Sequence, residues 1–105
     1  MDFFDKNLST FFLKKYGQTA FNIIAEQIKK ENLDKFNKSY IEIIFKIALY
    51  DFIGLNCIQV QDLLKHTYKK ININVQEIKN IHKKSIHKIQ EYLRASMQET
   101  LQENK

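Results

Sequence analysis

Apolar side chains recur at intervals of three and four residues over residues 8–30, a period typical of one face of an amphipathic helix. The polar stretch 31–35 that follows is rich in residues that favour turns and helix caps, so it predicts a break. Asn37 or Ser39 is then the expected N-cap of a second helix, because a short polar side chain there accepts a hydrogen bond from a free backbone N–H.

The segment from Asn37 to about Tyr68 predicts one long central helix, roughly 45 Å in length. It is apolar nearly all round between residues 41 and 60, so it must be covered on more than one side. The rest of the chain is too short to wrap it, and we expect a second chain to supply the missing cover. The residues expected at that interface lie on the main apolar face or at the crossing point, and they are Ile41, Phe45, Ala48, Phe52, Gly54, Leu55 and Leu63.

Gly54, in the middle of this segment, leaves two interpretations open. A glycine inside a helix costs about 1 kcal/mol relative to alanine. That cost is understandable if a second helix crosses there and its backbone must come close. Alternatively, Gly54 ends one helix and Asn56 caps another.

The chain after Tyr68 changes its pattern. Ile71 and Ile73 alternate with polar residues, which indicates a short extended segment. Asn74 followed by Glu77 three residues later has the spacing of a capping box, so a helix is expected from residue 75.

The last part of the chain predicts either one helix over 75–99 or two, with Ser85 capping the second. We expect a frayed tail over 100–105. In this interpretation 1–105 is a single domain, with its core over about 13–83 and a C-terminal helix over 85–99.

The composition supports an all-α class. The chain has no proline and two glycines, so the turn signals that a β-sandwich or barrel requires are missing. A lone cysteine, Cys57, excludes a disulfide within the chain and a cysteine-based zinc site. The longest uninterrupted apolar run, residues 47–50, is far too short to span a bilayer, and we expect no membrane association.

Positive charge is concentrated in one stretch. The chain has 17 Lys+Arg against 12 Asp+Glu, a net charge of +5. Residues 63–88 contain seven lysines and a single acid, Glu77. Such a block predicts a surface that binds a polyanion, with nucleic acid as the expected partner. The alternative is that these lysines only form a solvated helix face and bind no polyanion.

Catalytic and metal-binding patterns are weak. His82 and His87 are five residues apart, which places them about 140° apart around a helix and makes them a poor pair for one ion. We expect these histidines and His66 to be surface or DNA-facing residues. No nucleotide-binding or hydrolase motif is present, so we expect no enzymatic activity, cofactor, metal or small-molecule substrate.

The expected layout of short helix, long helix, basic extended loop and short helix resembles a histone fold. The stretch from His66 to Ser85 resembles most closely the centromere protein S family. The matching features are Ile73-Asn74, the acid at 77, the aliphatic residue at 78, Lys79, the basic pair 83–84 and Ser85, with Phe36-Asn37-Lys38, Leu13-Lys14, Glu26 and Ile28 upstream. The loop before Ile73 is one residue longer than in that family, and Glu77 stands where an aspartate is usual.

The resemblance implies an all-α histone fold with an extra C-terminal helix, paired in a handshake with a centromere protein X-like chain and able to form a tetramer of two pairs. It implies a nuclear subunit of kinetochore or DNA-repair complexes that binds double-stranded DNA. Contacts would be to phosphates, so binding should depend on salt and be largely indifferent to sequence. The lysines expected to make them are Lys35, Lys38, Lys69, Lys70, Lys83, Lys84 and Lys88.

Two other interpretations stay open. In the first, the chain resembles a helix-turn-helix domain of the sigma-factor region-4 type, with Gly54 starting a turn and residues 57–65 as the supporting helix. The side chains facing the major groove would then be Gln76, Lys79, Asn80 and Lys83. The long connection over 66–73 counts against this. In the second, the chain is a small helical adaptor or inhibitor whose basic block is incidental.

Overall fold

The computed structural model describes residues 9–31 and 38–103, which contain five helices and no strand. The helices are α1 (Ser9–Lys30), α2 (Lys38–Phe52), α3 (Cys57–Thr67), α4 (Val75–Ile81) and α5 (Lys83–Glu103). The all-α class is confirmed, and α1 confirms the first predicted helix. Within the described part of the chain, no helix is long and apolar enough to cross a membrane.

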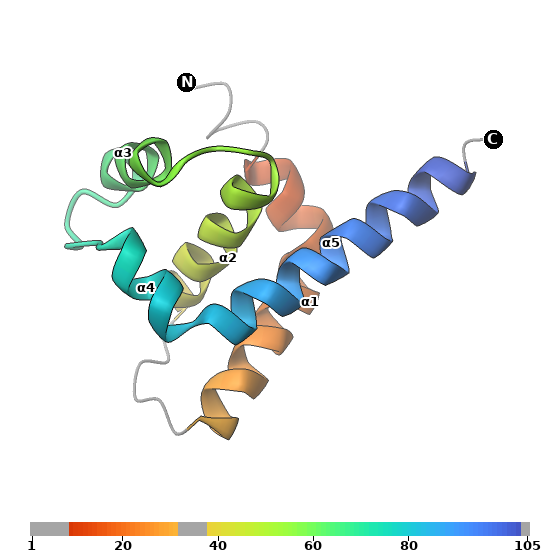
Figure 1. Cartoon of the computed structure of the whole chain (residues 1–105), viewed down its shortest axis with the longest axis horizontal. Helices are drawn as coiled ribbons and strands as arrows, with labels where there is room; N and C mark the ends of the chain where they lie inside the picture. The colour runs from red at the N-terminus through yellow and green to blue at the C-terminus, as the bar shows by residue number, and fades with distance from the viewer. Residues whose placement is uncertain (1–8, 32–37, 104–105) are drawn as a thin grey trace.

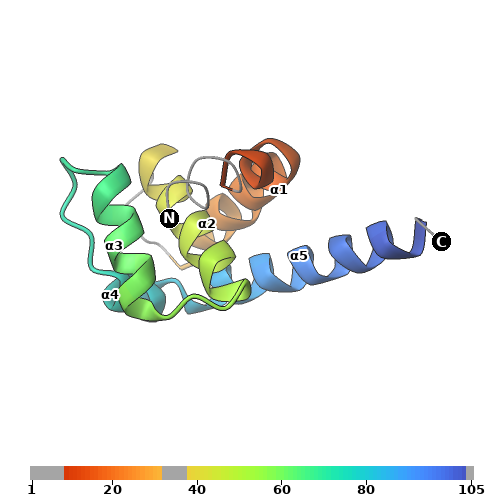
Figure 2. The same cartoon turned by 90° about the horizontal axis from the view of Figure 1, so that it is seen from above.

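α2 lies at the centre of the molecule (Figure 1). α1 and α5 pack against it and against each other, while α3 and α4 cover another side of it. α5 extends well beyond the other helices at its C-terminal end, as Figures 1 and 2 both show. The chain therefore covers its central helix with its own four other helices.

Burial along α2 confirms that this helix is apolar on more than one side. Every residue from 43 to 50 is buried, including Lys46, whose ammonium lies 4.9 Å from the ring centroid of Tyr68. Because α1, α3, α4 and α5 supply the cover, α2 does not require a second chain to bury its apolar sides. Of the expected interface residues, Ile41, Phe45, Ala48 and Leu63 are buried within this chain, Phe52 and Leu55 are partly buried, and Gly54 is exposed.

The prediction of one continuous helix from Asn37 to Tyr68 is wrong, and the alternative break at Gly54 is confirmed. Gly54 has φ +100°, its N–H donates to the Asp51 carbonyl at 3.1 Å, and the Leu55 N–H donates to the Tyr50 carbonyl at 3.0 Å. This pair of bonds is a Schellman motif, which ends a helix at a left-handed glycine. A Cβ built on Gly54 meets nothing within 4 Å, so this glycine is needed for its φ and not for the approach of a second helix.

α3 starts directly after this turn because Asn56 caps it. The Asn56 side chain accepts from the Gln59 N–H, and the Gln59 side chain accepts from the Asn56 N–H, both at 2.9 Å. The longest helices of the described residues are α1 and α5, of 22 and 21 residues, whereas α2 has 15 and α3 has 11. The expected short–long–short order is therefore absent from the described chain, and the structure supports the all-α class without the finer histone-fold assignment.

A boundary at His82 separates α4 from α5, so the chain has two helices here and Ser85 is not the cap. His82 caps α4 with its N–H on the Ile78 carbonyl at 2.9 Å, and its own carbonyl accepts from the Ile86 N–H at 2.9 Å. α5 continues to Glu103, so the tail predicted to fray from residue 100 is helical over most of its length.

His82 is only 2% exposed, which contradicts the prediction that all three histidines lie on the surface. Its Nε2 lies 2.8 Å from the hydroxyl of Tyr40, in the first turn of α2. Burial raises the pKa of Tyr40, and the negative charge of Glu77 raises it further. The Tyr40–His82 contact therefore joins the start of α2 to the α4–α5 junction.

The two glycines give a direct test of the helix break. Gly54→Ala should lower the free energy of unfolding by about 1–2 kcal/mol, because alanine is strained at positive φ. Gly17→Ala is the matched control, since Gly17 lies inside α1 where the new Cβ would make an ordinary contact with Leu13 at 3.9 Å. That variant should be more stable by about 0.5–1 kcal/mol. Stabilisation by both variants in urea unfolding would contradict the break.

Candidate nucleic-acid interface

The linker between α3 and α4 is held against α3 by Gln61. The Gln61 side chain accepts from the Val75 N–H at 2.9 Å and donates to the Ile73 carbonyl. Asn74 caps α4 as predicted, with its side chain accepting from the Glu77 N–H at 3.1 Å. Ile73 is buried whereas Ile71 is exposed, so the two isoleucines do not share a buried face as the predicted alternation required. These contacts give the basic linker a defined path.

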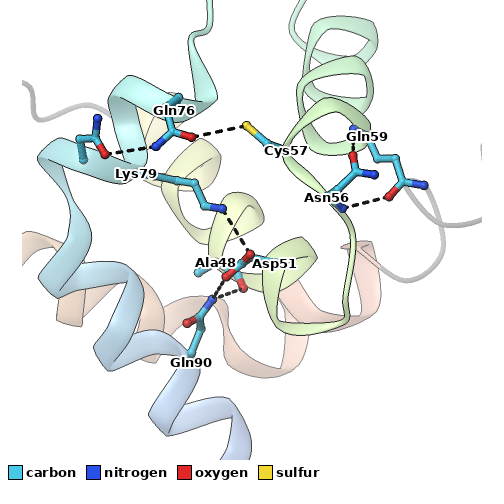
Figure 3. Close-up of polar contacts among 9 residues, drawn as sticks. Ala48, Asp51, Asn56, Cys57, Gln59, Gln76, Lys79 and Gln90 are labelled. Atoms are coloured by element: carbon cyan, nitrogen blue, oxygen red, sulfur yellow. Dashed lines mark hydrogen bonds and ion pairs between the residues drawn. The ribbon is translucent and has the colours of Figure 1, made fainter.

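Asp51, at the C-terminal end of α2, holds both α4 and α5 (Figure 3). Lys79 of α4 places its ammonium 3.2 Å from Oδ1, and Gln90 of α5 donates to Oδ2 at 2.8 Å. Gln90 also donates to the Ala48 carbonyl at 3.1 Å. One carboxylate therefore fixes the position of α4 relative to α5.

Four exposed polar residues lie along α4 and the first turns of α5, spaced three or four positions apart. We call this set the polar row, and its members are Gln76, Asn80, Lys83 and His87. All four line one open concavity of about 390 Å³, together with Asp51 and Lys79. Gln76 donates its Nε2 hydrogen to Asn80 Oδ1 at 3.2 Å, which fixes the two amides relative to each other.

The structure places the predicted lysines at three locations. Lys69 and Lys70 are exposed in the linker, whereas Lys83, Lys84 and Lys88 are exposed on the first two turns of α5. Lys38 is exposed at the start of α2 and lines a different groove, between α1 and α2. Lys35 lies outside the described residues.

Two of the α5 lysines reach across to the last turn of α1. Lys84 lies 3.8 Å from the Glu31 carboxylate, and Lys88 donates to Gln27 Oε1 at 3.1 Å. The exposed Lys29 and Lys30 lie between these two contacting residues in the sequence, in the last turn of α1. Sequence reasoning missed these two lysines, because nothing local indicates a contact between residues as far apart as 61 positions.

The helix-turn-helix interpretation expects four side chains to face DNA, and three of them share one exposed surface. Gln76, Asn80 and Lys83 lie exposed in the polar row, but Lys79 turns towards Asp51. α3 and α4 are joined by seven residues, 68–74, which is longer than the usual turn of this motif.

The described residues contain no group of three or more histidine, cysteine, aspartate or glutamate side chains placed to hold a metal ion. Comparison with protein-family models, with curated proteins and with solved structures found no match to this chain. The resemblance to the centromere protein S family therefore stays a prediction.

Replacing Asp51 tests its role in holding α4 and α5. Asp51→Ala removes the acceptor for Lys79 and Gln90, and we expect the free energy of unfolding to fall by about 1–3 kcal/mol. The control is Glu26→Ala, which breaks an exposed pair with Lys30 at 3.7 Å and should cost less than about 1 kcal/mol. Equal, small changes for both variants in urea unfolding would show that Asp51 is not a structural contact.

Proposed function

We propose that this chain is a non-enzymatic DNA-binding protein that contacts the phosphate backbone of a duplex. The observation that carries this proposal is the exposure of the basic stretch in the folded chain. Six of its seven lysines are exposed, at the end of α3, in the linker and on α5, and the seventh neutralises Asp51. The exposed ones are Lys65, Lys69, Lys70, Lys83, Lys84 and Lys88.

The proposed chemistry is electrostatic. Each lysine that neutralises a phosphate releases condensed counterions, so affinity falls as salt rises. Lys69 and Lys70 would contact one part of the backbone from the linker, and Lys84 and Lys88 of α5 would contact another. The exposed Lys29 and Lys30 at the end of α1 would extend the second contact.

The break at Gly54 favours a helix-turn-helix mode over a handshake. A handshake of two histone-fold chains needs a long central helix, whereas the helix-turn-helix interpretation needs α2 to end where it does and α3 to start anew. Gly54 and the Asn56 capping box provide that local structure. In this mode α3 is the supporting helix, and α4 with the start of α5 approaches the major groove.

The finer proposal of a histone-fold subunit has a different basis. Pairing with a centromere protein X-like chain, a place in kinetochore or DNA-repair complexes and a nuclear location all rest on the resemblance over His66 to Ser85. Such pairing would require α2 and α3 to become continuous, or the partner to bind a surface other than the buried face of α2.

Charge reversal in the linker tests the proposal. Lys69→Glu with Lys70→Glu should weaken binding to a random-sequence duplex by at least about tenfold at low salt, because two phosphate contacts become repulsive. The slope of log affinity against log salt should also become shallower by about 2. Fluorescence anisotropy with a labelled duplex measures both quantities.

The matched control is Lys14→Glu with Lys15→Glu, an adjacent pair on the exposed side of α1 with the same change in net charge. It should change affinity much less than the linker pair. Equal losses for the two pairs would indicate that net charge alone drives binding and would contradict an interface at the linker.

A further inference from the structure

We propose that the polar row reads base identity, with Asn80 contacting an adenine and Lys83 a guanine of a neighbouring base pair in the major groove. This inference rests on the proposed DNA binding and goes beyond it, because phosphate contacts alone carry no sequence information. The expected ligand is therefore a duplex that contains an A·T pair next to a G·C pair.

The orientation of the Asn80 amide supports the adenine contact. Asn80 Oδ1 accepts from Gln76 Nε2 at 3.2 Å, which fixes the amide plane and uses one of the two acceptor positions on Oδ1. Within the described residues, its amino group donates no hydrogen bond. One donor and one acceptor position are then available side by side, and this is the pattern that pairs with N7 and N6 of adenine.

The neighbouring residue in the polar row supplies a different chemistry. Lys83 is exposed three positions after Asn80 and lines the same concavity. Lysine is a good partner for the O6 and N7 acceptors of guanine. Asn80 lies in the last turn of α4 and Lys83 begins α5, and both line the same concavity, so they are placed to contact adjacent base pairs.

The row is also held in a fixed position. Asp51 forms an ion pair with Lys79 of α4 and accepts a hydrogen bond from Gln90 of α5 (Figure 3). The part of the polar row on α4 and the part on α5 therefore keep their relative positions without DNA. The neutralisation of Asp51 by Lys79 reduces the repulsion that a carboxylate in the concavity would otherwise exert on DNA. A preorganised set of donors and acceptors is what specific recognition requires.

α1 contains a second exposed amide pair with the same kind of hydrogen bond, so this hydrogen bond by itself does not identify a base-reading site. Gln18 donates to Asn22 Oδ1 at 3.3 Å with the same spacing of four residues. Both pairs are exposed, but the α1 pair does not lie in the concavity with Lys83 and His87. It therefore provides a matched control.

The experiment is selection of duplexes by the full chain from a pool with a randomised central segment, followed by sequencing. We expect enrichment of sites with an A·T pair adjacent to a G·C pair. In competition anisotropy, replacing the selected A·T pair by G·C should weaken binding of the unchanged protein about tenfold. Asn80→Ala should abolish that preference while its affinity for unselected duplex changes less than about threefold.

The control Asn22→Ala should keep both the selected sequence and the discrimination between pairs, and circular dichroism verifies that each variant is folded. Lys83→Gln should relax the preference at the neighbouring G·C pair. Salt-dependent binding without enrichment, or a preference that survives Asn80→Ala, would overturn the base-reading role and leave phosphate binding intact. An absence of any DNA binding would instead overturn the proposed function itself.

Discussion

The left-handed turn at Gly54 is the constraint on which the rest of the structure depends. Its φ of +100° ends α2 after 15 residues and reverses the chain, so that α3 and α4 return along the central helix. Without this turn the apolar residues of α2 would lie on a longer helix with uncovered sides. With it, the chain buries them using its own helices, and Asn56 stabilises the new start by accepting from the free Gln59 N–H of α3.

The same reversal positions the charged surface. Because α4 returns to the end of α2, Lys79 reaches Asp51, and the carboxylate also receives Gln90 of α5. The remaining lysines of the basic stretch then face solvent around the linker and the start of α5. Within the basic stretch, Lys79 is thus paired with Asp51 and the other six lysines are exposed, an arrangement suited to a polyanion partner.

The sequence predicts much of this architecture. Helical periodicity locates α1 and α2, the Asn56 and Asn74 caps locate the starts of α3 and α4, and the charge count locates the basic surface. Periodicity does not decide whether α2 and α3 are continuous, because the apolar spacing fits both forms. The Asp51 contacts and the burial of His82 join residues 28 to 42 positions apart, which local patterns do not predict.

The most direct test of the central claim is the change in backbone amide NMR shifts when a short duplex is added to the ¹⁵N-labelled chain. We predict the largest changes over residues 65–72 and 76–88, with the N-terminal half of α1 little affected. The unbound spectrum should also report helical shifts that are interrupted at Gly54. Changes centred on residues 10–20, or helical shifts that run through Gly54, would contradict this account of the fold and its interface.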